Sequence, residues 1–240
     1  MIQLKNFSIG FGHKRLLEDF NTLFPSHKLT SLIGRNGSGK STLMKAICKL
    51  NDKYSGEILI NGENIKNIPR HILASKLSYV NTHRPGMGNL KCIDVIRLGR
   101  SPYTDWHGRL SSHDDTSVEN ALSLVGMKEY AHRYFHTLSD GESQKIMIAR
   151  AIAQDTDIIL LDEPTSFLDL PTRYELVSLL KKLTEEEGKT ILFSTHELDI
   201  ALKLSDNIAL LDNPDFINLP KEKMVEYLIN THHPFSHFLS

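Results

Sequence analysis

The stretch Gly34-Arg35-Asn36-Gly37-Ser38-Gly39-Lys40-Ser41 decides how the rest of this 240-residue sequence is interpreted. It matches the pattern Gly-x-x-x-x-Gly-Lys-[Ser/Thr] at every defined position. The apolar run from Leu29 to Ile33 precedes it and predicts a buried strand, and residues Lys40 to about Leu50 predict a helix. Between a strand and a helix, glycines let successive backbone N–H groups curl around phosphates. The stretch therefore predicts a phosphate-binding loop.

The residues of this loop are expected to have separate tasks. Lys40 is expected to reach the β and γ phosphates of a nucleotide, and Ser41 to ligate Mg²⁺. The residues expected to contact the nucleotide are Gly34, Arg35, Asn36, Gly37, Ser38, Gly39, Lys40, Ser41 and Thr42.

Two further strand ends carry polar side chains. Asp162 closes the apolar run in DIILLDEP, where it could meet an ion bound to Ser41, and Glu163 could orient water beside the γ-phosphate as a general base. Without the loop, this acidic pair would read equally well as a helix N-cap. His196 closes LFSTHE and is expected at the same edge of a parallel sheet, although a lone histidine there is more often a bystander.

The order of patterns along the chain predicts an α/β protein. After Asp155, buried strands alternate with helical patterns, which is typical of a parallel sheet covered by helices on both faces. Between Cys92 and Gln154 only helical patterns occur. The N-terminal part contains extended pieces and an Asn61-Gly62 hairpin signal, which predict an antiparallel β subdomain.

The stretch Leu138 to Lys145 reads LSDGESQK and precedes a helical run. Ser139 followed by Glu142 predicts a capping box. A helix N-terminus opening with Ser and Gly could equally receive a phosphate, and the stretch alone leaves both interpretations open.

Composition excludes several classes of protein. The 28 Lys and Arg residues nearly balance the 29 Asp and Glu residues, so no global field favours nucleic acid. No run reaches the roughly 18 apolar residues of a membrane-spanning helix, so we expect a soluble chain that meets a membrane only through a partner. The two cysteines and the His132/His136 and His232/His233/His237 groups do not form a convincing metal site.

Four elements in order, GRNGSGKS, LSDGE, ILLDEP and STH, resemble the ATP-binding cassette (ABC) ATPases over nearly the whole chain. The resemblance implies ATP and Mg²⁺ as ligands and a P-loop NTPase fold with a RecA-like parallel sheet core. It implies a single ABC ATPase domain over 1–240. The nucleotide-binding core would comprise 1–88 and 155–240, and the inserted α-helical subdomain 89–154.

The resemblance also implies a homodimer with shared sites. LSDGE resembles the family's signature, normally Leu-Ser-Gly-Gly-Gln, so Ser139 and the Gly141 N–H would face the γ-phosphate held by the opposite subunit. Asp140 and Glu142 depart from that pattern, and we expect Asp140 to point into solvent. Asp169 would lie in the loop that links the two sites, and Phe11 would stack on adenine. Thr82 stands where the family usually has Gln, and no catalytic role is assigned to it.

The stretch VIRLGRSPYTDWHGRLSSHD resembles cassettes that serve importers of ferric siderophores, haem and vitamin B12. This implies an ATP-hydrolysing subunit lying peripherally on the cytoplasmic face of the inner membrane. Residues around Thr82 to Trp106 would contact an integral membrane permease, and an extracytoplasmic substrate-binding protein would act indirectly. No nucleic acid partner is expected. The alternative is a soluble ABC ATPase acting in assembly, such as iron–sulfur cluster biogenesis.

Overall fold

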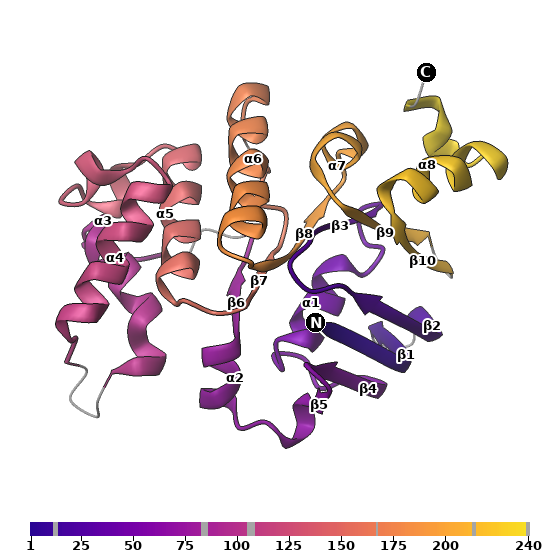
Figure 1. The fold of residues 1–240 in the computed structure, drawn as a ribbon, viewed down its shortest axis with the longest axis horizontal. Coiled ribbons are helices and arrows are strands. Elements are labelled where there is room, and N and C mark those ends of the chain that lie inside the picture. The colour runs from indigo at the N-terminus through magenta and orange to yellow at the C-terminus, as the bar shows by residue number, and fades with distance from the viewer. Residues whose placement is uncertain (12–13, 83–85, 105–108, 167, 213–214, 239–240) are drawn as a thin grey trace.

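A mainly parallel sheet lies at the centre of the fold (Figure 1). The computed structural model describes residues 1–11, 14–82, 86–104, 109–166, 168–212 and 215–238, without the side chains of residues 11, 14, 15, 237 and 238. The strand order is β10-β9-β3-β8-β7-β6, in which β10 is antiparallel to β9 and the other pairs are parallel. The strands are β3 (Leu29–Gly34), β6 (Leu77–Val80), β7 (Ile158–Leu161), β8 (Thr190–Thr195), β9 (Asn207–Asp212) and β10 (Asp215–Pro220).

The inner strands of this sheet are apolar on both faces because both faces are covered. In β7, Ile158 and Leu160 belong to one core cluster, and Ile159 and Leu161 belong to another. Successive side chains of a strand point to opposite faces, so an unbroken apolar run is what a doubly covered strand requires. Polar residues follow where the strands end, and this edge carries the candidate site.

The N-terminal part forms a second, antiparallel sheet with the order β2-β1-β4-β5. Its strands are β1 (Ile2–Phe11), β2 (Lys14–Phe24), β4 (Tyr54–Ile60) and the two-residue β5 (Glu63–Asn64). The predicted hairpin is confirmed, because Asn61 and Gly62 both adopt positive φ between β4 and β5.

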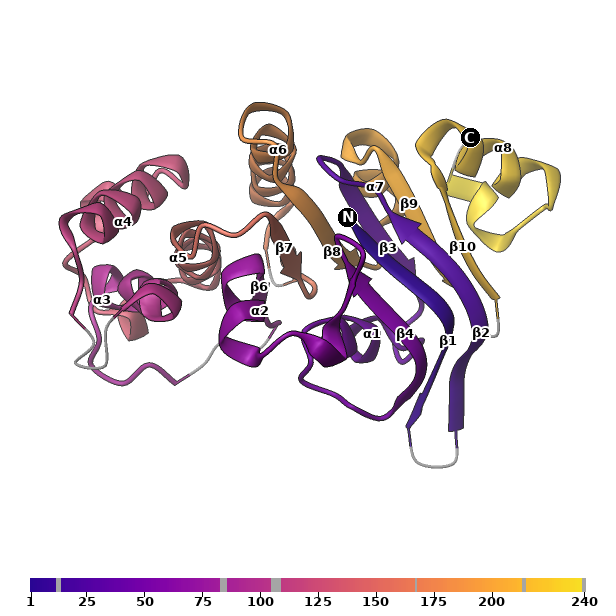
Figure 2. The same cartoon turned by 60° about the horizontal axis from the view of Figure 1, so that its bottom comes forward.

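Helix α1 (Lys40–Ile47) lies between the two sheets, beside β4 in Figure 2. Its Leu43 and Met44 are fully buried in the cluster that holds residues of both sheets. The helix ends three residues before the predicted Leu50. Lys49 takes a φ of 58° there and its N–H bonds the carbonyl of Ala46, which turns the chain out of the helix.

Helices gather at one end of the molecule, left in Figure 1. They are α3 (Cys92–Arg97), α4 (Ser112–Leu124) and α5 (Asp140–Ala153), with short 3-10 segments at Leu98–Tyr103, Lys128–Tyr130 and Phe135–Thr137. A buried Arg100 links three of these segments. Its Nε lies 2.7 Å from Asp114 Oδ1 of α4, and its Nη1 donates to the carbonyl of Ala153 at the end of α5 at 2.8 Å. Helix α4 ends at Leu124, and Gly126 follows with a φ of 69°, a left-handed value that is common just after a helix and favours glycine.

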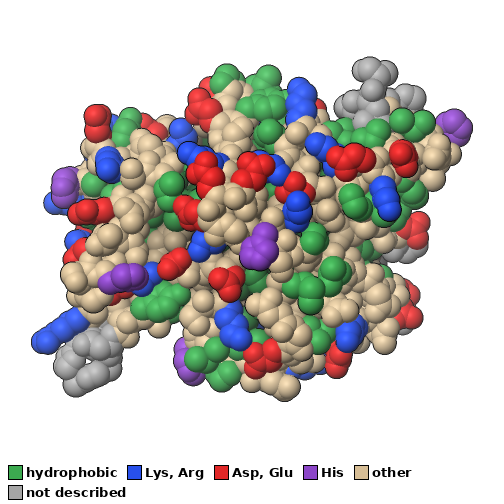
Figure 3. Space-filling model, in the orientation of Figure 1, with side chains coloured by type: hydrophobic (Ala, Val, Ile, Leu, Met, Phe, Trp, Pro, Cys, Tyr) green, Lys and Arg blue, Asp and Glu red, His purple; other side chains and the backbone are tan. Residues whose placement is uncertain are grey.

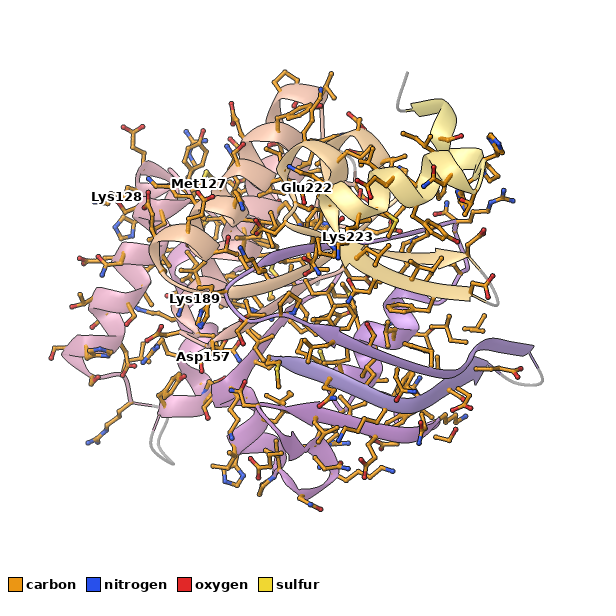
Figure 4. All side chains as sticks on the ribbon, turned by 45° about the vertical axis from the view of Figure 1, so that its right-hand side comes forward. Met127, Lys128, Asp157, Lys189, Glu222 and Lys223 are labelled. Carbon is orange, nitrogen blue, oxygen red and sulfur yellow. The ribbon has the colours of Figure 1, made fainter. Side chains whose placement is uncertain are left out.

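The remaining helices cover the other surfaces of the central sheet. They are α2 (Arg70–Lys76), α6 (Leu170–Glu186), α7 (Leu198–Leu204) and α8 (Lys221–Asn230), with 3-10 segments at Ile65–Asn67 and Pro234–Phe238. Strand β10 and helix α8 were not predicted from the sequence. Figure 4 labels Glu222 and Lys223 on α8, whose Met224 and Leu228 pack in the cluster that contains Ile208 of β9. Within the described ranges, no helix has the length and apolarity to cross a membrane.

Candidate active site

The phosphate-binding loop occupies the turn between β3 and α1, as predicted. Gly37 and Gly39 have φ values of 77° and 108°, which side-chain-bearing residues rarely adopt. A Cβ added to Gly34 would lie 2.6 Å from Ser38 Oγ and 2.7 Å from the carbonyl oxygen of Leu211. The glycines at these positions therefore permit the close turn that brings backbone N–H groups to one side.

Lys40 folds back over the loop that precedes it. Its Nζ donates to the carbonyl of Gly34 at 2.8 Å and to that of Arg35 at 3.3 Å, and it lies 3.8 Å from Glu163 Oε1. Burial lowers the pKa of Lys40, while the nearby charges of Glu163 and Asp162 oppose that lowering. The ammonium group is therefore held at the loop by carbonyl oxygens and one carboxylate.

Asp162 immediately follows β7, as the sequence indicates, and it is only 2% exposed. Its Oδ1 accepts hydrogen bonds from Ser41 Oγ at 2.9 Å and Ser194 Oγ at 2.8 Å, and its Oδ2 accepts one from the Tyr79 hydroxyl at 3.3 Å. Burial raises the pKa of Tyr79 and the Asp162 charge raises it further, so this hydroxyl stays protonated as a donor. Both oxygens of the buried carboxylate are thus satisfied by hydroxyl donors.

The same residues suit a magnesium ion. Mg²⁺ prefers oxygen ligands and usually binds through one or two carboxylates together with substrate phosphates. Ser41 Oγ and Asp162 Oδ1 converge at 2.9 Å beside the phosphate-binding loop. This oxygen donor pair therefore fits an ion shared with a nucleotide.

Glu163 faces the loop from the end of β7. Its backbone has a φ of 48°, a strained value for a residue with a side chain, and its N–H donates to Ser194 Oγ at 2.7 Å. Its Oε2 accepts a hydrogen bond from Ser166 Oγ at 3.2 Å, and its side chain is 25% exposed. A pocket of about 320 Å³ joins the carboxylate to the loop and is lined by Leu16, Gly37, Gly39, Lys40, Ser41, Thr42 and Glu163.

His196 follows β8, which pairs with β7 on one side and β3 on the other. It therefore lies at the expected edge of the sheet. Its side chain is 53% exposed and its Nε2 lies 4.0 Å from Glu197 Oε1. Thr82, which stands where the resembled family has Gln, donates its hydroxyl to the backbone carbonyl of Asp162 at 2.9 Å.

The predicted capping box at the start of α5 is confirmed. Glu142 N donates to Ser139 Oγ at 3.3 Å, and Glu142 Oε2 accepts from both the N–H and the hydroxyl of Ser139 at 2.9 Å. The Ser139 N–H bond is the main cause that lowers the pKa of Glu142. Ser139 and Asp140 are exposed, and a Cβ on Gly141 would lie 3.4 Å from a methyl group of Leu168.

Asp169 caps α6 by accepting a hydrogen bond from the N–H of Thr172 at 3.1 Å. Tyr103 is 41% exposed and its ring lies 4.2 Å from the Arg100 guanidinium carbon. The side chain of Phe11 and all of Trp106 lie outside the described residues, so their predicted roles stay predictions.

Sequence reasoning missed several residues that support the site. Tyr79 and Ser194 bond Asp162 from the two strands that flank β7, and Leu16 of β2 packs against Gly39. A signal for Ser194 was available, because it stands two residues before His196 in a strand already placed beside the site. Tyr79 carried no comparable signal.

The sequence of this chain is similar to proteins of one family. The sequence profile of the ABC transporter family matches residues 17–166. The petrobactin import ATP-binding protein of Bacillus subtilis is 38% identical over 94% of this chain and 89% of its own length. The corresponding protein of Bacillus anthracis is 34% identical over 95% of this chain and 84% of its own length.

Solved structures agree in fold. A metal-chelate type ABC transporter in an inward-facing conformation has a TM-score of 0.82 at 26% identity, covering 92% of this chain and 84% of that one. A dimeric ATP-binding cassette in a post-hydrolysis state with ADP and phosphate has a TM-score of 0.76 at 26% identity, covering 92% of this chain and 99% of that one.

Proposed function

This chain belongs to the ABC transporter family and is an ATPase, and we propose that its hydrolysis of ATP powers an importer whose cargo is an iron chelate. The observation that carries the proposal is the convergence of Lys40, Ser41, Asp162 and Glu163 around one pocket. The siderophore cargo is supported by relatives named for petrobactin import. Haem and cobalamin belong to the wider cargo class that the sequence resemblance implies.

The chemistry is attack of water on the γ-phosphorus, with cleavage of the bond to the ADP oxygen. Lys40 and the loop N–H groups stabilise the charge of the phosphate oxygens. Ser41 and Asp162 would hold Mg²⁺, which neutralises phosphate charge when bound. Glu163 orients the attacking water and accepts its proton, because its carboxylate faces the pocket and is held by Ser166 and by its own bonded backbone.

His196 has a supporting role in this proposal. It extends from the carboxyl end of β8 with a half-exposed imidazole, from which it can hydrogen-bond the γ-phosphate or the attacking water. Glu163 is the better-placed base, because its carboxylate lines the pocket at the loop, whereas His196 is not among the described residues that line it.

The active unit proposed is a homodimer with two shared sites. Ser139 and Gly141 begin α5 on an exposed end of the helical group, where a second subunit could reach them. Each site would combine one chain's loop with the other chain's Ser139, Gly141 and Asp169. Phe11 would contact the adenine.

The proposed partners follow from the importer assignment. Residues around Thr82 to Trp106 would contact the permease, and the extracytoplasmic binding protein would act through that permease. The chain would lie peripherally on the cytoplasmic face of the inner membrane. On the face seen in Figure 3, acidic and basic side chains are interleaved, in keeping with the net charge of −1.

The test combines catalysis with location. Glu163→Gln should bind ATP but lose nearly all phosphate release, and Lys40→Ala should lose nucleotide binding or hydrolysis. The chain should also sediment with native membranes and co-purify with an integral membrane protein. Normal turnover by both variants would refute the site. A wholly soluble complex with normal ATPase chemistry would instead favour a role in assembly and refute the importer.

A mixed dimer tests the shared sites. Glu163→Gln and Ser139→Ala chains should each be poorly active alone, because every site carries one lesion. In a heterodimer both lesions fall in one site and the other site is intact. Doubly tagged heterodimers should therefore release phosphate faster than either homodimer, whereas no gain is expected if Ser139 serves its own chain.

A further inference from the structure

We propose that Tyr79 is a positioning residue whose hydroxyl fixes the orientation of the Asp162 carboxylate toward the bound metal and nucleotide. The inference rests on the proposed function, since it concerns the same site. It assigns a role to a residue of β6, the strand that ends just before the position where Thr82 replaces the family's usual Gln.

The backbone N–H and carbonyl of Asp162 are both bonded to β6 and the residues that follow it. Its N–H donates to the carbonyl of Val80 at 2.9 Å, and its carbonyl accepts the Thr82 hydroxyl at 2.9 Å. The first bond continues the parallel pairing of Tyr79 with Leu160 and Val80 with Leu161, and the second adds a side-chain donor beyond the end of β6. The orientation of the Asp162 side chain is therefore the remaining freedom at this point of the sheet.

That freedom is removed by a donor on each carboxylate oxygen. Ser41 and Ser194 both donate to Oδ1, whereas Tyr79 donates to Oδ2 at 3.3 Å. Donors on Oδ1 alone would let the carboxylate pivot about that oxygen. The bond to Oδ2 fixes the carboxylate plane and so keeps Oδ1 directed at Ser41.

Tyr79 is suited to this task because its ring is itself held. The ring packs, partly buried, against the core cluster that includes α1 and both sheets, so the hydroxyl is carried on a rigid support. Hydrogen-bond partners of a metal-binding group orient it and tune its affinity, and removing one typically costs 10–100-fold in metal affinity or activity.

The test is Tyr79→Phe, which removes the hydroxyl and keeps the ring. Tyr174→Phe is a matched control, because the Tyr174 hydroxyl also donates to an aspartate carboxylate, Asp199 Oδ2 at 3.1 Å, but between α6 and α7. Both changes are made in the full chain carrying Glu163→Gln, so that ATP is not consumed. Mn²⁺ binding to the protein–ATP complex is followed by electron paramagnetic resonance, and metal-free ATP binding by calorimetry.

We expect Tyr79→Phe to raise the Kd for Mn²⁺ about tenfold. Metal-free ATP binding should match that of the parent, and Tyr174→Phe should match the parent in both binding measurements. An unchanged Mn²⁺ affinity would overturn the inference, as would an equal loss of metal-free ATP binding, which would indicate a general packing role. If the parent bound neither ATP nor Mn²⁺, the proposed function itself would fail.

Discussion

Replacing Ser194 by Ala should damage both the stability and the chemistry of this protein, because one hydroxyl serves two neighbouring residues. Ser194 is fully buried in β8. Its Oγ donates to Asp162 Oδ1 at 2.8 Å and accepts the N–H of Glu163 at 2.7 Å. The substitution removes a single oxygen atom and leaves the strand unchanged.

The magnitude follows from the two bonds lost. A hydrogen bond to a charged group contributes about 1.5–3 kcal/mol, and a buried donor left without a partner costs about 1–3 kcal/mol. Since the Glu163 N–H is only partly buried, we expect the free energy of unfolding to fall by roughly 3 kcal/mol. Glu163 also loses the bond that holds its strained backbone, at a φ of 48°. Misplacement of its carboxylate should lower kcat by about 10–100-fold.

Urea unfolding and steady-state phosphate release measure the two effects. Ser31→Ala is the matched control, because Ser31 is a fully buried serine of β3 whose hydroxyl has no partner among the described residues. We expect Ser31→Ala not to lower the free energy of unfolding, because it removes a buried hydroxyl that has no partner in the described part of the chain. The reasoning is refuted if Ser194→Ala behaves like Ser31→Ala in both assays.

Three further outcomes are expected. Asp114→Ala should destabilise the protein by about 3–5 kcal/mol in urea unfolding, because it leaves the buried charge of Arg100 without its carboxylate partner. Asp115→Ala, which removes the exposed ion pair with Arg97, should cost under about 1 kcal/mol. Equal losses would contradict this. Hydrogen bonds from Ser111, with help from Arg100, lower the pKa of Asp114 to about 2. The contribution of Asp114 to stability is therefore complete above about pH 4 and is lost as the pH falls toward 2. The free energy of unfolding of Asp114→Asn should consequently fall less steeply with decreasing pH than that of the parent. Parallel pH dependences in the two proteins would contradict this prediction. Gly39→Ala should abolish nucleotide binding in calorimetry, because its φ is 108° and the new methyl group would lie 3.3 Å from Leu16; retained binding would show that the loop relaxes.

The sequence was most informative where local chemistry determines local structure. The loop from Gly34 to Ser41 requires left-handed glycines between a strand and a helix, and Ser139 with Glu142 forms a cap within four residues. Such features depend on neighbours in the chain, so spacing alone predicts them.

The features that could not be predicted depend on the order of strands in the sheet. Tyr79 meets Asp162 only because β6 lies beside β7, and the order of strands along the chain does not give their order in space. Helix α8 was missed for another reason. Met224, Tyr227 and Leu228 recur at helical spacing and pack in one cluster, so the helical pattern was present, but on a segment of only ten residues after a strand that was not predicted either.

The two halves of the proposed composite site differ in whether their side chains are already free to bind a nucleotide. Lys40, Asp162 and Glu163 are already held within one chain, whereas the Ser139 hydroxyl donates its only proton to Glu142. For the Ser139 hydroxyl to donate to the γ-phosphate of the opposite subunit, it must first break its hydrogen bond to Glu142. The cap would survive the exchange, because Glu142 Oε2 keeps the N–H of Ser139 and Ser139 Oγ can still accept from the N–H of Glu142. In the proposed dimer, the charged Glu142, which stands where the resembled family has a neutral Gln, would therefore add a cost to closure while leaving the start of α5 capped.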